Sequence, residues 1–458
     1  MKLNSYKQVF FIGIGGIGMS ALARYFKMKG VEVGGYDRTA SQLTEELQKE
    51  GISIVFSDEE KLIDEKFKNS KTTLVVFTPA VPNTHRQLNY FKNNGFTVKK
   101  RSEVLGLISG EYQSICVAGT HGKTTISGLT SHIFKNSSLG CMAFLGGISK
   151  NYNTNFLWTE NTNYAIMEAD EFDRSFLQLK PFTALISSVD ADHLDIYESK
   201  EKVHEAYKKF AESVPSDCAL IIKHGLPVDF KLQKYVRCFT YSITDKNADF
   251  FGSNVIRRNN RFAFTLKTPY SKINLEINLP GLINIENAVA ACALALANGV
   301  EEEELKKALS SFQGMERRFD TQINTQTLVY IDDYAHHPEE IKATLSSIRK
   351  MYFGYKITVI FQPHLYSRTR DFHKEFAQAL SLADNLILLD IYPAREEPIA
   401  GVSSKMIGDL VNKIPVQYCQ KNEIVDNISL KRHHVVVTMG AGDIDREVKI
   451  IKEKLQEK

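Results

Sequence analysis

Residues 114–125 read SICVAGTHGKTT, an apolar strand that ends on a glycine and continues through a short loop into a helix. A lysine followed by two threonines at a helix start can hold the β- and γ-phosphates of a nucleotide and place a hydroxyl on Mg²⁺. The loop departs from the standard G-x-x-x-x-G-K-[ST] pattern, because Val117 stands where its first glycine would be. The sequence predicts a nucleotide-triphosphate site formed by Gly119, Thr120, His121, Gly122, Lys123, Thr124 and Thr125.

The next two apolar strands, within 164–170 and 182–190, each finish in acidic residues. The carboxyl ends of neighbouring strands converge on the ligand crevice of a doubly wound sheet, so we expect these groups to face the phosphate loop. Carboxylate oxygens suit Mg²⁺, and an imidazole can bind a second divalent ion. Six carboxylates lie at or just after these two strand ends, within 168–173 and 190–192. Most of them are explained equally well as solvated charges in loops or as helix caps. We therefore single out only Glu168 and His193 as metal ligands, together with Thr124.

A second glycine loop follows the first strand of the chain, where residues 9–18 read VFFIGIGGIG. The spacing from Gly13 to Gly18 allows a tight turn and the close approach of a diphosphate to a helix N-terminus. Asp37, at the end of the second strand, is placed to accept a hydrogen bond from a ribose or a base. Taken alone, the loop is typical of an NAD-binding domain, and glycines needed only for the turn are the simpler alternative. The pattern fixes a diphosphate but not the nucleotide that carries it.

Three polar clusters border the strands of the last third of the chain. They read ERRF at 316–319, DDYAHHP at 332–338 and QPHLYSR at 362–368. One isolated arginine or histidine pair is usually a pair of solvent-exposed residues without a binding role, but three polar clusters at strand ends indicate a binding surface.

The alternation of strand, loop and helix repeats in three cycles, which predicts an α/β protein with three domains. We place Rossmann-like domains at 1–107 and 316–458 and a central P-loop domain at 108–315, with boundaries near Leu107 and Met315. Segment 250–279 alternates like antiparallel strands, so we expect an extra small antiparallel sheet in the central domain.

Composition excludes several classes of protein. The chain has 458 residues, a net charge of +3 and 43% hydrophobic residues, and its longest apolar run is too short to cross a bilayer. No basic block indicates a nucleic-acid partner, and the six scattered cysteines indicate reduced thiols. We expect a cytoplasmic protein without membrane or nucleic-acid partners, either a monomer or a weak homodimer.

The motifs, taken in order, resemble the Mur ligase family. They include GIGGIGMSALA, GTHGKTT, EADEFDRSFL, DADHLDIY, ERRFD, DDYAHHP, FQPHLYSRTRDF, IYPAREEPI and MGAGD, and they span essentially the whole chain. The resemblance implies an N-terminal UDP-sugar domain, a central ATPase domain, and a C-terminal domain that brings the amino acid and closes over ATP. It is strongest to members that use ATP and Mg²⁺ to join L-alanine to the lactyl carboxylate of UDP-N-acetylmuramate through an acyl phosphate. A relative that adds a peptide to the same nucleotide is the alternative; a dehydrogenase would leave GTHGKTT unused.

The resemblance also implies a role for each matching residue. Gly15, Gly16, Ile17 and Gly18 would hold the UDP-sugar diphosphate, with Asp37, Thr78 and Arg101 as further contacts. Lys123 and Thr124 would bind the ATP phosphates and Mg²⁺, while Glu168 completes the first metal site and His193 a second. Asn284, Asn287 and Arg317 would contact ATP, Asp333 its ribose and His336 the γ-phosphate region. Tyr334, His364 and Arg368 would approach alanine, and His121 the muramic acid carboxylate. The catalytic set would be Lys123, His193, His336 and Arg368.

Three positions depart from the family pattern. Ser188 replaces an expected asparagine, Ile283 a frequent histidine, and Leu365 a common arginine, which leaves Arg368 as the cation for the amino acid carboxylate. Some relatives hold the second metal with a carbamylated lysine, but neither Lys208 nor Lys209 can be assigned that role from sequence. The general base is open as well, with His364 as one candidate.

Overall fold

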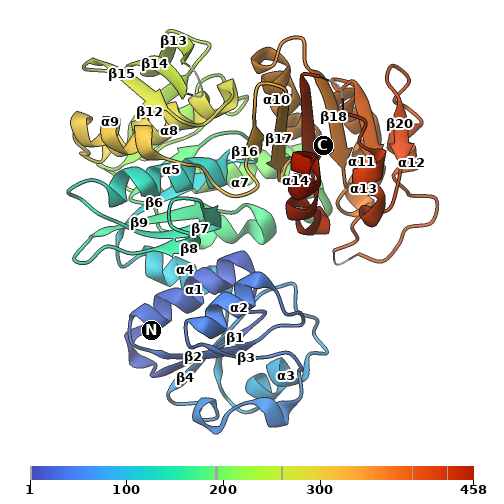
Figure 1. Cartoon of the computed structure of the whole chain (residues 1–458). Coiled ribbons are helices and arrows are strands. Elements are labelled where there is room, and N and C mark those ends of the chain that lie inside the picture. The colour runs from blue at the N-terminus through green and yellow to red at the C-terminus, as the bar shows by residue number, and fades with distance from the viewer. Residues whose placement is uncertain (1–2, 191–193, 259–260, 395, 431, 458) are drawn as a thin grey trace. The chain divides into compact units, whose positions relative to one another are not determined.

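Three β-sheets with flanking helices make up the chain in this computed structural model (Figure 1). The structure describes residues 3–190, 194–258, 261–394, 396–430 and 432–457. The chain divides into two units, Met1–Asn278 with Glu286–Gln313, and Leu279–Ile285 with Gly314–Lys458. Two of the sheets belong to the first unit and one to the second. The predicted three-domain α/β class is confirmed, because each predicted domain contains one sheet, although two of these sheets share the first unit. The boundaries near Leu107 and Met315 stay predictions.

The first sheet is parallel, with strand order β3-β2-β1-β4-β5. Its first strand alternates between two buried faces, with Val9 and Phe11 in one cluster of apolar side chains and Phe10 and Ile12 in another. Burial on both faces explains why this strand is apolar from Val9 to Ile12. The strands are β1 (Gln8–Ile12), β2 (Glu32–Tyr36), β3 (Ser53–Val55), β4 (Thr73–Phe77) and β5 (Thr97–Lys100), and the helices are η1 (Leu3–Ser5), α1 (Ile17–Met28), α2 (Gln42–Lys49), η2 (Glu60–Leu62), η3 (Glu65–Phe67), α3 (Arg86–Asn93) and α4 (Arg101–Ser109).

The central sheet is mixed, with strand order β15-β14-β13-β12-β11-β10-β6-β9-β7-β8. Its strands are β6 (Gln113–Ala118), β7 (Met142–Ser149), β8 (Thr154–Leu157), β9 (Tyr164–Ala169), β10 (Thr183–Ile186), β11 (Ala219–Lys223), β12 (Arg237–Ser242), β13 (Phe250–Arg258), β14 (Arg261–Lys267) and β15 (Lys272–Ile277). The helices are α5 (Lys123–Lys135), η4 (Phe172–Gln178), α6 (Leu194–Tyr197), α7 (Lys200–Glu212), α8 (Leu282–Ala297) and α9 (Glu302–Ser311).

The predicted antiparallel strands are present as β13, β14 and β15, but they do not form a sheet of their own. They continue the central sheet, because β13 pairs in parallel with β12 over Tyr241 and Ser242. The alternating sequence pattern predicts strands with one buried face, but it does not indicate that β13 pairs with β12.

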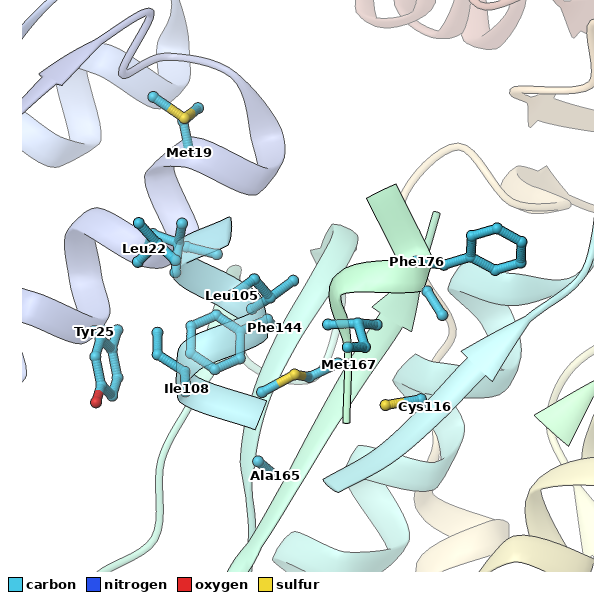
Figure 2. Packing of buried hydrophobic residues seen from close by; sticks show 14 of the residues in the cluster. Met19, Leu22, Tyr25, Leu105, Ile108, Cys116, Phe144, Ala165, Met167 and Phe176 are labelled. Carbon is cyan, nitrogen blue, oxygen red and sulfur yellow. The ribbon is translucent and has the colours of Figure 1, made fainter. Parts of the chain in front are cut away.

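Helices α1 and α4 lie between the first sheet and the central sheet (Figure 1). Figure 2 shows Leu22 and Tyr25 of α1 beside Phe144 of β7, and the Tyr25 and Phe144 ring centroids are 5.6 Å apart. A Cβ on Gly106 of α4 would lie 2.4 Å from the carbonyl oxygen of Gln178, so only glycine permits this approach. The helix that follows the first glycine loop is therefore packed directly on the P-loop domain.

The third sheet has the order β16-β17-β21-β18-β19-β20 and is parallel except where β16 meets β17. Its strands are β16 (Asp320–Asn324), β17 (Leu328–Asp333), β18 (Lys356–Phe361), β19 (Asn385–Leu388), β20 (Val416–Tyr418) and β21 (His434–Met439). The helices are α10 (Pro338–Met351), α11 (Tyr366–Leu380), α12 (Lys405–Gly408), η5 (Lys421–Glu423), α13 (Ile424–Asn427), η6 (Asp443–Glu447) and α14 (Val448–Glu457). Over the described ranges of the whole chain, no helix is long and apolar enough to cross a membrane.

Candidate active site

The loop after β6 has a backbone path that its glycines make possible. Gly119 and Gly122 have φ angles of +133° and +82°, which L side chains rarely adopt. A Cβ on Gly119 would lie 2.1 Å from Ser187 Oγ, and one on Gly122 would lie 2.8 Å from Asn287 Oδ1. The predicted residue Asn287 therefore lies against the loop, and α5 starts at Lys123 with its first amides at the loop.

Side chains from the end of β10 hold the other side of this loop. The amide of His121 donates to Ser188 Oγ at 2.8 Å, and Ser187 Oγ donates to the carbonyl of His121 at 2.5 Å. Thr120 donates to the carbonyl of Asp190, whose carboxylate lies 3.3 Å from His121 Nε2. Ser188, the serine that departs from the family pattern, thus supports the phosphate loop directly.

The ammonium of Lys123 forms a buried ion pair with Glu171. Its Nζ lies 2.7 and 3.0 Å from the two carboxylate oxygens of Glu171 and donates to the carbonyls of Gly119 and Thr120 at 2.7 and 3.3 Å. The side chains of Lys123 and Glu171 are 13% and 4% exposed. Burial lowers the pKa of Lys123, but Glu171, Asp170 and Glu168 together outweigh it and raise that pKa above its ordinary value.

Sequence reasoning placed Glu171 in an acidic run but did not select it. Four acids lie within 168–173, and the charge pattern cannot tell which of them turns inward. The backbone after β9 determines which acid turns inward. There the Tyr197 hydroxyl donates to the carbonyl of Glu171 at 2.7 Å and fixes the backbone of that residue.

Glu168 lies where the sequence predicted a metal ligand. One carboxylate oxygen accepts from the Thr124 hydroxyl at 3.0 Å, and the other accepts from the amide of Gly146 on β7 at 3.0 Å. A Cβ on Gly146 would lie 2.2 Å from this carboxylate, so the approach depends on glycine. A hydroxyl and a carboxylate side by side match the oxygen donors that Mg²⁺ prefers. In the described part of the chain, no three His, Cys, Asp or Glu side chains form a metal cluster.

Three further predicted residues of this region are His193, Thr125 and Asn284. His193 lies outside the described residues, so its metal role stays a prediction from sequence. Thr125 is buried on α5. Asn284 belongs to the second unit, where its side-chain Nδ2 donates to the carbonyl of Pro280 at 2.6 Å.

The first glycine loop is bordered by the three side chains predicted to contact the UDP-sugar. A Cβ on Gly13 would lie 2.6 Å from Thr78 Cγ2, and one on Gly18 would lie 2.8 Å from Arg101 Nη1. The amide of Gly15 donates to Asp37 Oδ2 at 2.7 Å. Gly16 caps α1, whose first turn begins with Ile17 and Gly18 and offers their amides no internal acceptor. Free amides at a helix N-terminus with a cation beside them are typical of an anion-binding site, so the predicted diphosphate role of this loop stays a prediction.

Arg317 links the end of β17 to the residue after β21, and Asp333 links the end of β17 to α10. Arg317 Nη2 donates to the carbonyl of Gly440 at 2.6 Å, and its Nε lies 3.5 Å from Asp332. Asp333 accepts from the Thr344 hydroxyl at 2.7 Å and from the amide of Ala335. Burial raises the pKa of Asp333 to about 6. The Asp332 pKa is also raised to about 6 by burial, against the opposing effect of Arg317.

Aromatic and histidine rings gather next to these strand ends. His336 lies edge-on to Tyr334 and His364, with ring centroids 5.2 and 6.0 Å apart. His364 in turn stacks on Tyr392. Arg368, in the first turn of α11, is only 6% exposed, so its side chain is buried and does not project into solvent. The second unit thus brings together three of the residues predicted to approach alanine or the γ-phosphate, His336, Tyr334 and His364.

Models of three Mur ligase domains match the chain one after another. The Mur ligase family catalytic domain matches residues 8–113, the Mur ligase middle domain 117–295, and the Mur ligase glutamate ligase domain 317–442. This chain belongs to the Mur ligase family. Family membership removes the dehydrogenase interpretation of the loop at Gly13 to Gly18, which explained one motif and left the P-loop unused.

Individual Mur ligases resemble the chain over its whole length. It is 50% identical to the UDP-N-acetylmuramate–L-alanine ligase of Phocaeicola vulgatus over 450 residues, which cover 98% of each chain. It is similar to the solved structure of UDP-N-acetylmuramate-alanine ligase MurC from Thermotoga maritima, with a TM-score of 0.82, 25% identity, and coverage of 98% of this chain and 99% of that one. A murein peptide ligase from Psychrobacter arcticus gives a TM-score of 0.69 at 21% identity and covers 98% of both chains, a likeness of fold alone.

Proposed function

We propose that this chain joins L-alanine to the lactyl carboxylate of UDP-N-acetylmuramate at the expense of ATP, a step of peptidoglycan precursor synthesis. The observation that carries the proposal is its 50% identity, along nearly the whole of both chains, to a relative named for that activity. The P-loop and the glycine loop at α1 supply the two phosphate-binding elements that this reaction needs. Because its substrates are a UDP-sugar and ATP, we assign the reaction to the cytoplasm.

The chemical problem is to make an amide from an unreactive carboxylate. Transfer of the γ-phosphoryl group to the lactyl carboxylate gives an acyl phosphate and ADP. The amine of alanine attacks the acyl carbon, a tetrahedral intermediate forms, and inorganic phosphate leaves with the carboxylate oxygen. Phosphoryl transfer depends mainly on positioning and charge neutralisation, which is the role we assign to the Lys123 ammonium at the start of α5.

The donor set at the P-loop fits Mg²⁺. Thr124 Oγ1 and Glu168 Oε1, 3.0 Å apart, are the residues that would hold it. When bound, such an ion neutralises charge on the transferring phosphoryl group. His193 is proposed as a ligand of a second ion from sequence alone.

Binding roles are proposed for each unit separately. In the first unit, Gly15 to Gly18 take the diphosphate with Asp37, Thr78 and Arg101 around it, and His121 approaches the muramic acid carboxylate. In the second unit, His364 is a candidate base for the alanine ammonium. The further second-unit assignments are Asn284, Arg317, Asp333 and His336 toward ATP, and Tyr334 and Arg368 toward alanine.

Phosphate release tests the proposal. Purified protein with ATP and Mg²⁺ is given UDP-N-acetylmuramate alone, L-alanine alone, or both, and the product is identified by mass. Rapid release only with both substrates, with product heavier than the UDP-sugar by one alanyl residue, is expected. Turnover with a tripeptide but not with alanine would identify the peptide-adding type of Mur ligase instead.

A further inference from the structure

The P-loop lysine in this structure already has a full set of acceptors. An ammonium carries three N–H donors, and Lys123 Nζ faces four oxygens, two from Glu171 and the carbonyls of Gly119 and Thr120. A nucleotide phosphate that takes a hydrogen bond from Lys123 must displace at least one of these oxygens. The two carbonyls belong to the loop that the phosphate itself approaches.

Glu171 is the one charged group among these acceptors, and it is held in place. Its side chain is 4% exposed, the Tyr197 hydroxyl fixes its carbonyl, and the amide of Arg174 donates to the same carbonyl. An incoming phosphate must therefore compete with a fixed carboxylate for the N–H donors of Lys123, in a poorly solvated site where charge-assisted hydrogen bonds are strong.

We propose that Glu171 is an internal counter-ion, which pairs with Lys123 and competes with the nucleotide phosphates for it. This inference rests on the proposed function only in assigning ATP phosphates to Lys123. Glu171 neutralises the buried ammonium, which stabilises the protein when no nucleotide is bound, and it lowers nucleotide affinity, which favours release of ADP after turnover. It is a positioning residue, since it acts on the phosphates through Lys123.

The test is ADP binding to Glu171→Gln, measured by calorimetry in EDTA and again in Mg²⁺. Loss of the competing charge should strengthen ADP binding about tenfold in both conditions, the scale of one charge-assisted hydrogen bond. Without nucleotide, Glu171→Gln should melt at a lower temperature than wild type, and ADP should raise its melting temperature by more than it raises that of wild type. Glu160→Gln, the same change at an exposed residue, is the matched control and should leave ADP affinity unchanged.

A role of Glu171 in holding the fold alone predicts unchanged or weaker ADP binding, and a role as a metal ligand predicts weaker binding in Mg²⁺ only. Either result overturns the proposal. In a Lys123→Met background, Glu171→Gln should no longer strengthen ADP binding, and a persistent gain would show that Lys123 is not the link. If Glu171→Gln does not fold, Glu171→Asp gives the same test with a retracted carboxylate, again expected to bind ADP more tightly. Wild-type protein that binds no ADP in either condition would refute the proposed function rather than this inference.

Discussion

Replacing Gly146 by alanine would place a methyl group where the Glu168 carboxylate now lies. The new Cβ would be 2.2 Å from Oε2 and 2.6 Å from Cδ of Glu168, whereas ordinary contacts of a Cβ begin at 3.4 Å. The carboxylate must therefore retreat by about 1.2 Å, the difference between 3.4 and 2.2 Å. It cannot then keep its hydrogen bonds to the Gly146 amide and the Thr124 hydroxyl, both 3.0 Å long.

Displacement of a reacting or metal-holding group by about 1 Å costs on the order of 100-fold in rate, about 2.7 kcal/mol of transition-state stabilisation. Gly146→Ala should lower kcat by about this factor and raise the Mg²⁺ concentration needed for half-maximal rate by roughly 10- to 100-fold. The fold should persist, because Gly146 lies in an extended strand that alanine tolerates.

The assay is amide formation at saturating substrates across a Mg²⁺ titration, with thermal melting and UDP-sugar affinity as controls for folding. A folded Gly146→Ala variant with wild-type kcat and wild-type Mg²⁺ dependence would refute the assignment of Glu168 to the metal site.

Two further predictions concern the second unit. Arg368→Lys should raise the KM for L-alanine and leave the KM for ATP unchanged, because lysine cannot reproduce a bidentate contact with a carboxylate. Steady-state kinetics with each substrate varied separately measures both values. A defect confined to ATP would contradict the assignment of Arg368 to alanine. Asp333 has a pKa raised from 3.8 to about 6 in the folded protein, so the folded state binds its proton more tightly than the unfolded state, and this carboxyl's contribution to stability falls as the pH rises from about 4 to 6. The free energy of unfolding of wild type minus that of Asp333→Asn should therefore drop by roughly 2 kcal/mol between pH 4 and pH 7 in urea titrations, and a pH-independent difference would show that Asp333 ionises normally.

The strands and the phosphate loops were predictable because their patterns are local. An apolar run that ends on glycine before a helix start identifies β6 and Gly119, and acidic strand ends identify Glu168. The structure places Asp37, Thr78 and Arg101 around the first glycine loop, although their binding roles stay predictions.

Pairing and side-chain direction depend on contacts that are distant in sequence, and here the sequence was insufficient. Nothing in segment 250–279 indicates that β13 joins β12. Nothing in the acidic run distinguishes Glu171, which turns to Lys123, from Asp173, which pairs with Lys100. No sequence pattern indicates a role for Gly146, because its role depends on the Glu168 carboxylate that lies next to it in the folded chain.

The central claim is that the P-loop activates the substrate carboxylate while a separate glycine loop binds the UDP-sugar. The most direct test compares Lys123→Ala with wild type, measuring phosphate release with both substrates present and UDP-N-acetylmuramate affinity by calorimetry. The account predicts that phosphate release and amide formation are abolished while the UDP-sugar dissociation constant changes less than about threefold, because the Gly15–Gly18 loop and Lys123 follow different strands of different sheets. Substantial ligation by Lys123→Ala, or equal loss of ligation and UDP-sugar binding in a folded variant, would contradict it.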